Sequence, residues 1–193
     1  MHSEKVDAQD LIGATALLGG RLSEQVSVTG RYDVKCLDAD GNLKWEDSIQ
    51  NLVVNVGKAN ILSVYLGADT QTTTWYMGLV DNTGYTAYNA ADTMSSHTGW
   101  SESVAYSNST RPTVTFGTAT ASGGGAGSAG TGSIVSTAVT FTINASATIL
   151  GAFLTTDSAK SGTTGTLYSA GSFASSRAVI SGDSLLVTYT AQS

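Results

Sequence analysis

The chain has 193 residues and a formal net charge of −6, with 41% apolar and only 12% charged residues. That charged share is about half of what is usual for soluble proteins. Scarce charge and a single proline argue against the common kinds of disorder, and the acidic balance argues against binding nucleic acid through a basic face. Ser, Thr and Gly make up over a third of the chain, which is typical of short strands and tight turns. We therefore predict an all-β protein.

The sequence also bears on the compartment in which the protein is made. No apolar run approaches the roughly 20 residues of a membrane-spanning helix. The first residues lack the basic and long apolar regions of a signal peptide. The single cysteine, Cys36, excludes an intramolecular disulfide and suits a reducing cytoplasm. We expect a protein made in a cytoplasm, with no membrane or nucleic-acid partner and no cofactor.

Charged residues are concentrated near the start of the chain, because 15 of the 24 Lys, Arg, Asp and Glu residues fall within residues 1–60. This asymmetry divides the chain into three parts. We predict an extended arm at 1–25, a β-hairpin with a helix at 26–73, and a weakly charged β-sandwich domain at 74–193.

The predicted arm contains two short apolar pairs, Leu11-Ile12 and Leu17-Leu18. They are separated by Gly and polar residues and are too sparse to form a core of their own. Chain termini of this kind stay loose unless something ties them down. The arm is therefore either a frayed tail or a segment that docks on another protein.

A β-hairpin is predicted by two alternating runs around the turn "LDADGN". Apolar residues recur at every second position over 26–36, and the alternation resumes with Leu43, Trp45 and Ile49. Cys36 lies on the apolar face, so we expect a packed side chain and not a nucleophile. The turn lacks the full twelve-residue pattern of a calcium loop with its terminal Glu.

One helix is predicted over residues 55–67, "NVGKANILSVYLG", with Asn55 as N-cap and Gly67 at its C-terminal end. Four residues at spacings of three and four form an apolar face: Ala59, Leu62, Tyr65 and Leu66. We expect this face to cover one side of the sheet.

From about residue 74 the sequence alternates between strands and Gly/Ser turns. The segments "TWYMGLV", "PTVTF", "VTFTI" and "LLVTY" read as strands, and "TILGAFLT" is apolar on both faces, as in a central strand of a sandwich. The inward positions are Val114, Phe116, Val139, Phe141, Ile143, Leu185, Val187 and Tyr189. We predict a β-sandwich or jelly roll.

The glycine-rich segment "ASGGGAGSAGTG" at 121–132 lies between two of these strands. A phosphate-binding loop would need a following Lys-Ser/Thr and a helix, which this segment lacks. We predict a surface loop.

Catalytic groups are scarce. His97 stands near Asp92, Ser95 and Ser96, but serines are so abundant that this proximity carries little information, and a nucleophile elbow is absent. Two histidines and one cysteine are too few for a zinc site. We predict that the protein is not an enzyme; a hydrolase that uses His97 is the alternative.

Aromatic residues are concentrated between residues 75 and 106: Trp75, Tyr76, Tyr85, Tyr88, Trp100 and Tyr106. Such side chains stack on sugar rings, because they combine an apolar face with a polar edge. They also fill the cores of β-sandwiches, and burial tendencies favour that interpretation. Both hypotheses remain open.

Several sequence blocks together are distinctive. They are "RYDVKCLDADGNLKWEDSIQNLVVNVGKANILSVYL", "WYMGLVDN", "ADTMSSHTGWSESVAYSNSTRPT", "FTINASATILGAFLTT" and "GTTGTLYSAGSF". In this combination the chain, from about residue 26 to its end, resembles a family of virion structural proteins from tailed bacteriophages. Members of that kind are similar in role to capsid decoration or cement proteins, which bind the shell of the major capsid protein.

The resemblance implies a non-enzymatic decoration protein that bridges and stabilises major capsid protein subunits. It implies a location on the capsid surface of the virion, after synthesis in the host bacterial cytoplasm, and the role suggests a jelly-roll homotrimer. A tail, collar or fibre component that binds host surface glycans is the alternative. The candidate capsid-contact residues are Leu11, Ile12, Leu17, Leu18, Lys35, Lys44, Glu46 and Asp47.

The docking hypothesis for the arm is tested by its deletion. If the arm docks, a chain lacking residues 1–25 should remain a folded β domain, since the core residues lie elsewhere, but should no longer bind phage shells. Co-sedimentation with shells measures binding, and circular dichroism checks the fold. Unchanged occupancy of the shells would identify the arm as a frayed tail.

Overall fold

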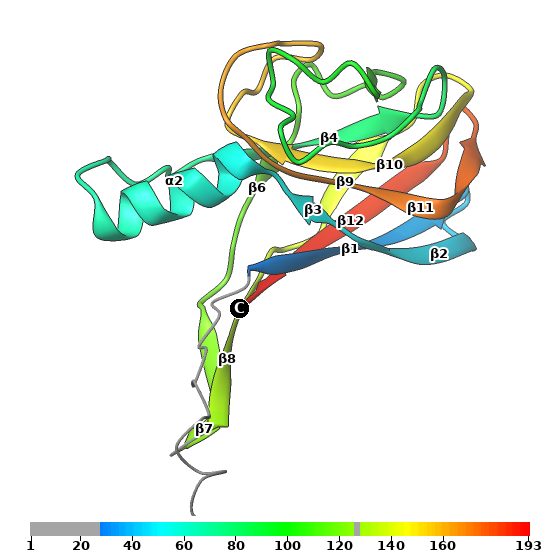
Figure 1. Cartoon of the computed structure of the whole chain (residues 1–193). Coiled ribbons are helices and arrows are strands. Elements are labelled where there is room, and N and C mark those ends of the chain that lie inside the picture. The colour runs from blue at the N-terminus through cyan, green and yellow to red at the C-terminus, as the bar shows by residue number, and fades with distance from the viewer. Residues whose placement is uncertain (1–27, 126–127) are drawn as a thin grey trace, which may run out of the picture.

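The computed structural model describes residues 28–125 and 128–193, which form two antiparallel sheets packed as a sandwich (Figure 1). The first sheet contains β1 (Thr29–Leu37), β2 (Leu43–Gln50), β7 (Thr120–Gly125), β8 (Ser128–Val135), β9 (Val139–Thr142) and β12 (Ser184–Gln192). The second contains β3 (Leu52–Val53), β4 (Trp75–Asp81), β5 (Ser101–Ser103), β6 (Thr113–Val114), β10 (Ala147–Thr155) and β11 (Leu167–Val179). Helix α2 (Asn55–Leu66) follows β3. The predicted all-β sandwich with a hairpin and a short helix is confirmed.

The strand order joins the early and late parts of the chain. It is β2-β1-β12-β8-β7 in the first sheet, where β9 also pairs with β12, and β3-β11-β10-β4-β5 in the second, where β6 pairs with β4. The segments 26–73 and 74–193 therefore share both sheets and do not form separate layers. The jelly-roll connectivity stays a prediction.

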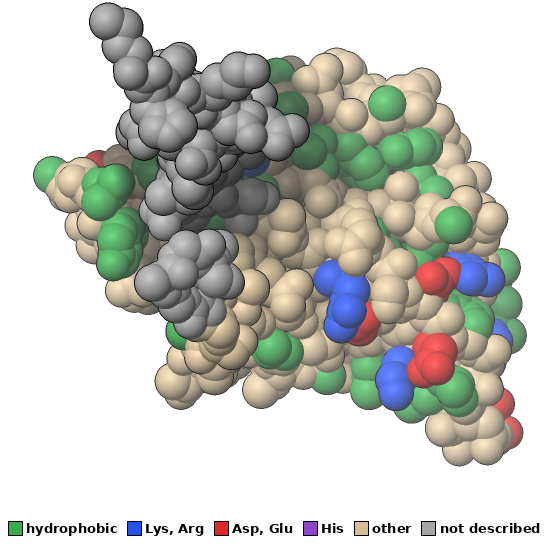
Figure 2. All heavy atoms as spheres, turned by 60° about the horizontal axis from the view of Figure 1, so that its bottom comes forward, with side chains coloured by type: hydrophobic (Ala, Val, Ile, Leu, Met, Phe, Trp, Pro, Cys, Tyr) green, Lys and Arg blue, Asp and Glu red, His purple; other side chains and the backbone are tan. Residues whose placement is uncertain are grey.

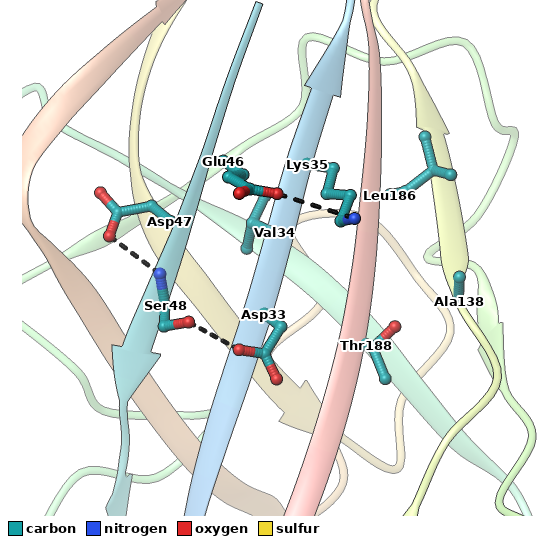
Figure 3. Close-up of a pocket in the computed structure, with 9 residues that line it drawn as sticks. All are labelled: Asp33, Val34, Lys35, Glu46, Asp47, Ser48, Ala138, Leu186 and Thr188. Atoms are coloured by element: carbon teal, nitrogen blue, oxygen red, sulfur yellow. Dashed lines mark hydrogen bonds and ion pairs between the residues drawn. The ribbon is translucent and has the colours of Figure 1, made fainter. Parts of the chain in front are cut away.

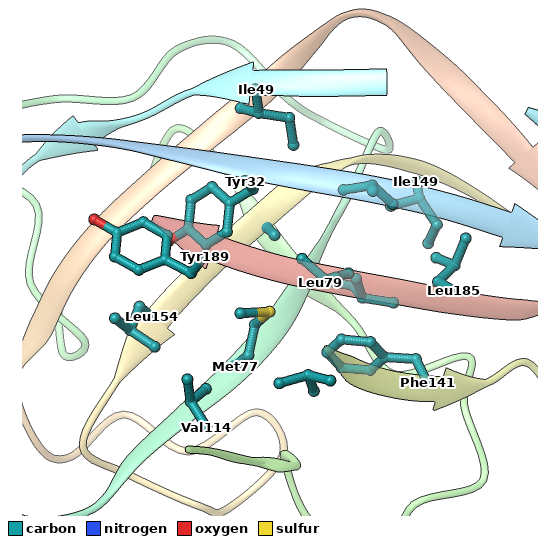
Figure 4. Packing of buried hydrophobic residues seen from close by; sticks show 14 of the residues in the cluster. Tyr32, Ile49, Met77, Leu79, Val114, Phe141, Ile149, Leu154, Leu185 and Tyr189 are labelled. Carbon is teal, nitrogen blue, oxygen red and sulfur yellow. The ribbon is translucent and has the colours of Figure 1, made fainter. Parts of the chain in front are cut away.

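The main core lies between the two sheets and follows the period-two pattern of the sequence. In the first sheet Tyr32 pairs with Tyr189 and Val34 with Val187, and all four side chains are buried. Strand β9 adds Phe141, which is fully buried. Figure 4 shows Tyr32, Tyr189 and Phe141 in one cluster with residues of the second sheet, namely Met77, Leu79, Ile149 and Leu154. The predicted inward faces of β1, β9 and β12 are confirmed.

The second sheet is covered on both faces, and β10 is the central strand that its sequence predicts, buried on both faces from residue 149 to 155. Its outer face carries a second apolar cluster in which Leu150 and Phe153 of β10 meet Met94 and Trp100. The last two come from the long connection 82–100, which folds back over the sheet. This connection is therefore part of the core.

The β1–β2 turn has the predicted structure, with one difference in the strand that follows. The Asp38 carboxylate accepts hydrogen bonds from the backbone N–H groups of Asp40 and Asn42, at 3.0 and 2.8 Å. Cys36 is buried, and burial raises the pKa of its thiol to about 11, which keeps it protonated at neutral pH. Leu43 is exposed, because a register shift after Cys36 takes it off the inward face.

The helix has the predicted length, but two predictions about it are wrong. Val54 is its N-cap and makes no side-chain capping bond, while Asn55 is the first helical residue. The predicted apolar face does not cover the sheet, since Tyr65 is 86% exposed. The first half of the helix packs on the sandwich: Gly57 lies so close to the Tyr168 carbonyl that a Cβ would clash, and Ile61 packs on the main core. The rest of α2 projects away from the sheets (Figure 1).

The segment 121–132 is not the predicted surface loop, because most of it belongs to a hairpin of β7 and β8. Ladder pairs run from Thr120↔Ser133 to Gly125↔Ser128. The sequence lacked a strand pattern here because Gly, Ala, Ser and Thr leave no apolar alternation, whereas backbone ladders need none. Figure 1 shows this hairpin projecting below the sandwich.

No helix in the described part of the chain is long and apolar enough to cross a membrane.

The second cluster provides a test of the packing. Trp100 is 4% exposed and contacts Phe153 at a ring-centroid distance of 5.1 Å. Trp100→Ala should lower the free energy of unfolding by about 3–5 kcal/mol, because it empties a large buried site. Urea denaturation measures the change, and Val104→Ala at an exposed position should shift it by less than about 0.5 kcal/mol. Equal effects of the two substitutions would contradict this packing.

Candidate interaction surfaces

Two of the predicted contact residues, Lys35 and Glu46, lie opposite each other on the outer face of β1 and β2. Their charged groups are 3.6 Å apart and both side chains are 62% exposed. Figure 3 shows this pair beside a hollow of about 480 Å³, in which Ser48 donates a hydrogen bond to Asp33 at 2.6 Å. An exposed pair of this kind contributes little to stability. It is free to exchange its internal partner for an external one.

The other two charged candidates, Lys44 and Asp47, take part in tertiary ion pairs. Lys44 Nζ lies 2.6 Å from the buried carboxylate of Asp183, and this hydrogen bond raises the lysine pKa above its usual value. Asp47 of β2 pairs with Arg177 of β11 at 2.5 Å, so it joins one sheet to the other. The same hydrogen bond lowers the pKa of the Asp47 carboxyl. Both residues therefore make ion pairs within the chain, from the edge strand β2 to segments near its C-terminal end.

The remaining candidates, Leu11, Ile12, Leu17 and Leu18, lie outside the described residues. On the face formed by β1 and β2, Figure 2 shows charged side chains as neighbours of opposite sign, surrounded by uncharged surface. Arg31 and Asp33, 3.0 Å apart, make one further such pair. The face therefore carries no single-sign patch that would attract a partner over a distance.

An apolar surface is exposed at the end of α2. It consists of Leu62, Tyr65 and Leu66, which we call the helix tip, and their exposed fractions are 59%, 86% and 77%. Figure 2 shows hydrophobic side chains grouped on this projection, at the left. The predicted apolar face of the helix thus exists, but it faces away from the core.

A groove of about 630 Å³ opens where the two sheets separate at one end of the sandwich; we call it the end groove. Leu154, Tyr168 and Tyr189 form its floor, with Trp75 and Phe116 beside them. In Figure 4, Tyr189 and Leu154 lie toward one end of the core, away from Leu185 and Phe141. No charged residue lines the groove within the described parts of the chain.

The β7–β8 hairpin is a third exposed feature. β8 pairs with β12 only over Ser133–Val135 in the described structure, so the ladder beyond that point has no third strand. Ser122 and Thr131 form a cross-strand hydroxyl pair, 3.1 Å apart. No charged residue occurs between Arg111 and Asp157 in the sequence. Within the described parts of the chain, the hairpin thus has a neutral surface of small residues and an unpaired strand edge.

His97 does not form a catalytic arrangement. Its ring stacks on Trp100 at a centroid distance of 4.0 Å, and its Nδ1 lies 3.1 Å from the Trp100 carbonyl. Asp92 accepts a hydrogen bond from Trp100 Nε1 instead, at 3.0 Å. No hydrogen bond joins His97 to Asp92 or to a serine among the described residues, nor do these residues contain a cluster that could hold a metal ion.

The aromatic block belongs mainly to the core. Trp100 and Tyr106 are buried, and Tyr106 packs on Phe141 at a centroid distance of 5.0 Å. Tyr85 and Tyr88 are half-buried against the second cluster. The core interpretation is therefore confirmed for these residues, and the block does not form an exposed aromatic platform.

Sequence reasoning missed the most enclosed charged group, the guanidinium of Arg111. It is 1% exposed and forms a double hydrogen bond with Glu102, at 3.0 and 2.8 Å. It also donates to the carbonyls of Asp157 and Gly162, at 2.8 and 3.1 Å. Glu102 further accepts from the Tyr106 hydroxyl and the Ser161 N–H, at 3.2 and 2.6 Å. The residues of this cluster, which we call the clamp, come from three separate segments of the chain: 102–106, 111 and 157–162. Only the tertiary structure therefore identifies it.

The clamp is structural, because its hydrogen-bonding groups are used internally. Burial, together with the nearby Glu102, raises the pKa of Tyr106 well above its usual value. Lys160 covers the ring of Tyr106 and donates to its carbonyl at 2.6 Å, and burial lowers the pKa of this lysine. The small cavity beside the clamp, about 220 Å³, includes His97 in its lining.

The fold and these surfaces define an all-β sandwich with two weakly charged projections, α2 and the β7–β8 hairpin, and an apolar end groove. Comparison with protein-family models, curated proteins and solved structures found no match to this chain. The phage-virion resemblance therefore stays a prediction from the sequence blocks.

The clamp can be tested by removing its cation. Arg111→Met should lower the free energy of unfolding by about 3–5 kcal/mol, because it leaves the Glu102 charge buried and unpaired. The double variant Arg111→Met, Glu102→Gln should recover part of that loss, since the buried Glu102 charge is then removed together with its partner. Lys35→Gln, which removes one charge of an exposed pair, should cost at most about 1 kcal/mol. Urea denaturation of all three variants measures these differences, and a loss for Arg111→Met as small as that for Lys35→Gln would overturn the structural role.

Proposed function

We propose that this protein is a non-enzymatic structural protein of a tailed-bacteriophage virion. It binds the outer surface of the shell as a decoration protein and bridges subunits of the major capsid protein. It is made in the host cytoplasm and has its place on the assembled capsid. The starting point is the resemblance of its sequence blocks to virion structural proteins.

The observation that carries this proposal is the projecting β7–β8 hairpin. Two-stranded hairpins without a hydrophobic face are at best marginally stable in water. Among the described residues, this hairpin extends past its contact with β12 and β7 has no partner on its other edge, where a strand or backbone of another protein can bind. A bound partner would stabilise it, and its lack of charge avoids the cost of desolvating ions on contact.

The position of the hairpin agrees with a docking role for the arm. Thr29, where β1 begins, pairs with Gln192, and Gln192 pairs with Ser133 at the base of the hairpin. The described chain therefore begins beside the base of the hairpin, so that an arm docking on a shell would act next to it. The exposed pair Lys35–Glu46 is a further candidate for fixing the register of that contact.

Such a role needs no strong single contact. A shell repeats the same binding site many times, and linked contacts of one attached protein reinforce each other through high effective concentration. A protein that binds the assembled lattice and not separated subunits stabilises the lattice by mass action. The packing of His97 on Trp100 is consistent with a protein that performs no catalysis.

The proposal predicts the behaviour of particles that lack this protein. Such shells should assemble, but should release their DNA at a lower temperature than complete particles, because the bridging contacts are missing. Heating both samples while following DNA release with a fluorescent dye measures the effect. The number of copies per particle should be in the hundreds. Identical release curves, with a few dozen copies at most, would favour a tail component.

Point variants connect this behaviour to the hairpin. The double variant Ser122→Glu, Thr131→Glu should not bind to shells that lack this protein, because it places two charges in the proposed contact. Thr83→Glu, at an exposed position in a different loop, should bind as the wild type does. Binding of the hairpin variant at wild-type level would remove the hairpin from the interface.

A further inference from the structure

The helix tip is a fixed apolar surface without a cover. Among the described residues, Leu62, Tyr65 and Leu66 are the three most exposed large apolar side chains, and all three lie on one helix at spacings of three and four. Single exposed apolar residues are common on protein surfaces, but grouped ones mark binding sites. The only charged residue of α2 is Lys58, one turn before Leu62.

The tip is held in place by the first half of the helix. Gly57 is buried against the Tyr168 backbone, and Val56 and Ile61 pack on the two apolar clusters. After the helix, the Gly67 N–H donates to the Ser63 carbonyl at 3.0 Å, and the Ser63 hydroxyl donates to Asp69. The helix therefore presents its tip away from its own sandwich instead of folding it inward.

The end groove has the chemistry and the size to accept an apolar side-chain group. Its volume of about 630 Å³ is within the range of about 300–1,000 Å³ found for ligand pockets. Its floor is apolar and aromatic, and its rim carries the exposed hydroxyl side chains of Thr73, Thr74, Thr113 and Thr115. A tyrosine with two leucines suits such a groove, since the rings and alkyl groups contact the floor while the tyrosine hydroxyl reaches the rim.

Charge favours a second copy of the chain as the occupant. With a net charge of −6, two copies repel each other unless they meet through neutral surfaces. The three side chains of the tip and the described lining of the groove are uncharged, so their contact brings no like charges together.

We infer that the protein self-associates by inserting the helix tip of one copy into the end groove of a second copy. This contact covers the exposed leucines and tyrosine and fills the space between the separating sheets. The inference does not rest on the proposed function, because it concerns the purified protein in the absence of shells.

Variants on each side of the contact test it. The tip variant is Tyr65→Asp with Leu66→Ser, and the groove variant is Thr115→Arg, which places a long charged side chain at the rim. Ile180→Ser is the control, since Ile180 is also a large exposed apolar residue, 56% exposed, but lies outside both surfaces. Sedimentation equilibrium gives the mass of each sample, and circular dichroism checks that each variant is folded.

The wild type and the control should have masses of at least twice 19.7 kDa, whereas each variant alone should have the single-chain mass of 19.7 kDa. Mixing the two variants should restore association as pairs of one tip variant with one groove variant, because the intact tip of one then meets the intact groove of the other. A wild type that stays at the single-chain mass at all soluble concentrations overturns the inference. So does association of either folded variant at wild-type strength, or a mixture that stays monomeric.

Discussion

The pairing of β1 with β12 is the constraint on which the first sheet depends. It joins nine residue pairs, from Thr29↔Gln192 to Leu37↔Ser184, and so connects the first described strand to the last. The other edge of β12 pairs with both β9 and β8. Ser136, which lies between these two strands, makes two hydrogen bonds to Tyr189: its N–H donates to the Tyr189 carbonyl, and its hydroxyl accepts from the Tyr189 N–H, both at 2.9 Å. Because the paired strands are so distant in sequence, bringing them together costs a large loop-closure entropy, which the burial of the whole core must offset.

The same pairing couples the two sheets. Tyr32 and Tyr189 lie side by side with ring centroids 4.7 Å apart, and the Tyr32 hydroxyl bonds to the Ser169 hydroxyl of the second sheet at 2.7 Å. At the edges, the ion pair of Asp47 with Arg177 adds a second link. In a chain with so few charges, these polar contacts fix which residues face each other, while the apolar core supplies most of the stability.

The uncharged surfaces of the sandwich lie on its two projections and at one of its ends. The helix tip, the end groove and the β7–β8 hairpin each lack charge, and the charged residues of the β1–β2 face are mostly paired with one another. A protein that assembles through many copies on a repeating lattice benefits from this arrangement, since neutral contacts form without the desolvation of ions. Contacts between copies and contacts with a lattice use different parts of the molecule in the two proposals.

The sequence by itself determined the elements whose side chains alternate or recur regularly. The period-two runs at Tyr32–Val34 and Val187–Tyr189 predicted their strands and inward faces, and the spacing around Leu62 and Tyr65 predicted a helix of the right length. Only the tertiary structure decided what packs against each face, because a periodic pattern places side chains on one face of an element but does not determine which other element contacts that face. It turned the apolar face of α2 outward, built a hairpin from residues too small to form a pattern, and brought Glu102 to Arg111 from a different segment. Backbone ladders and buried ion pairs depend on contacts that close only when the chain folds.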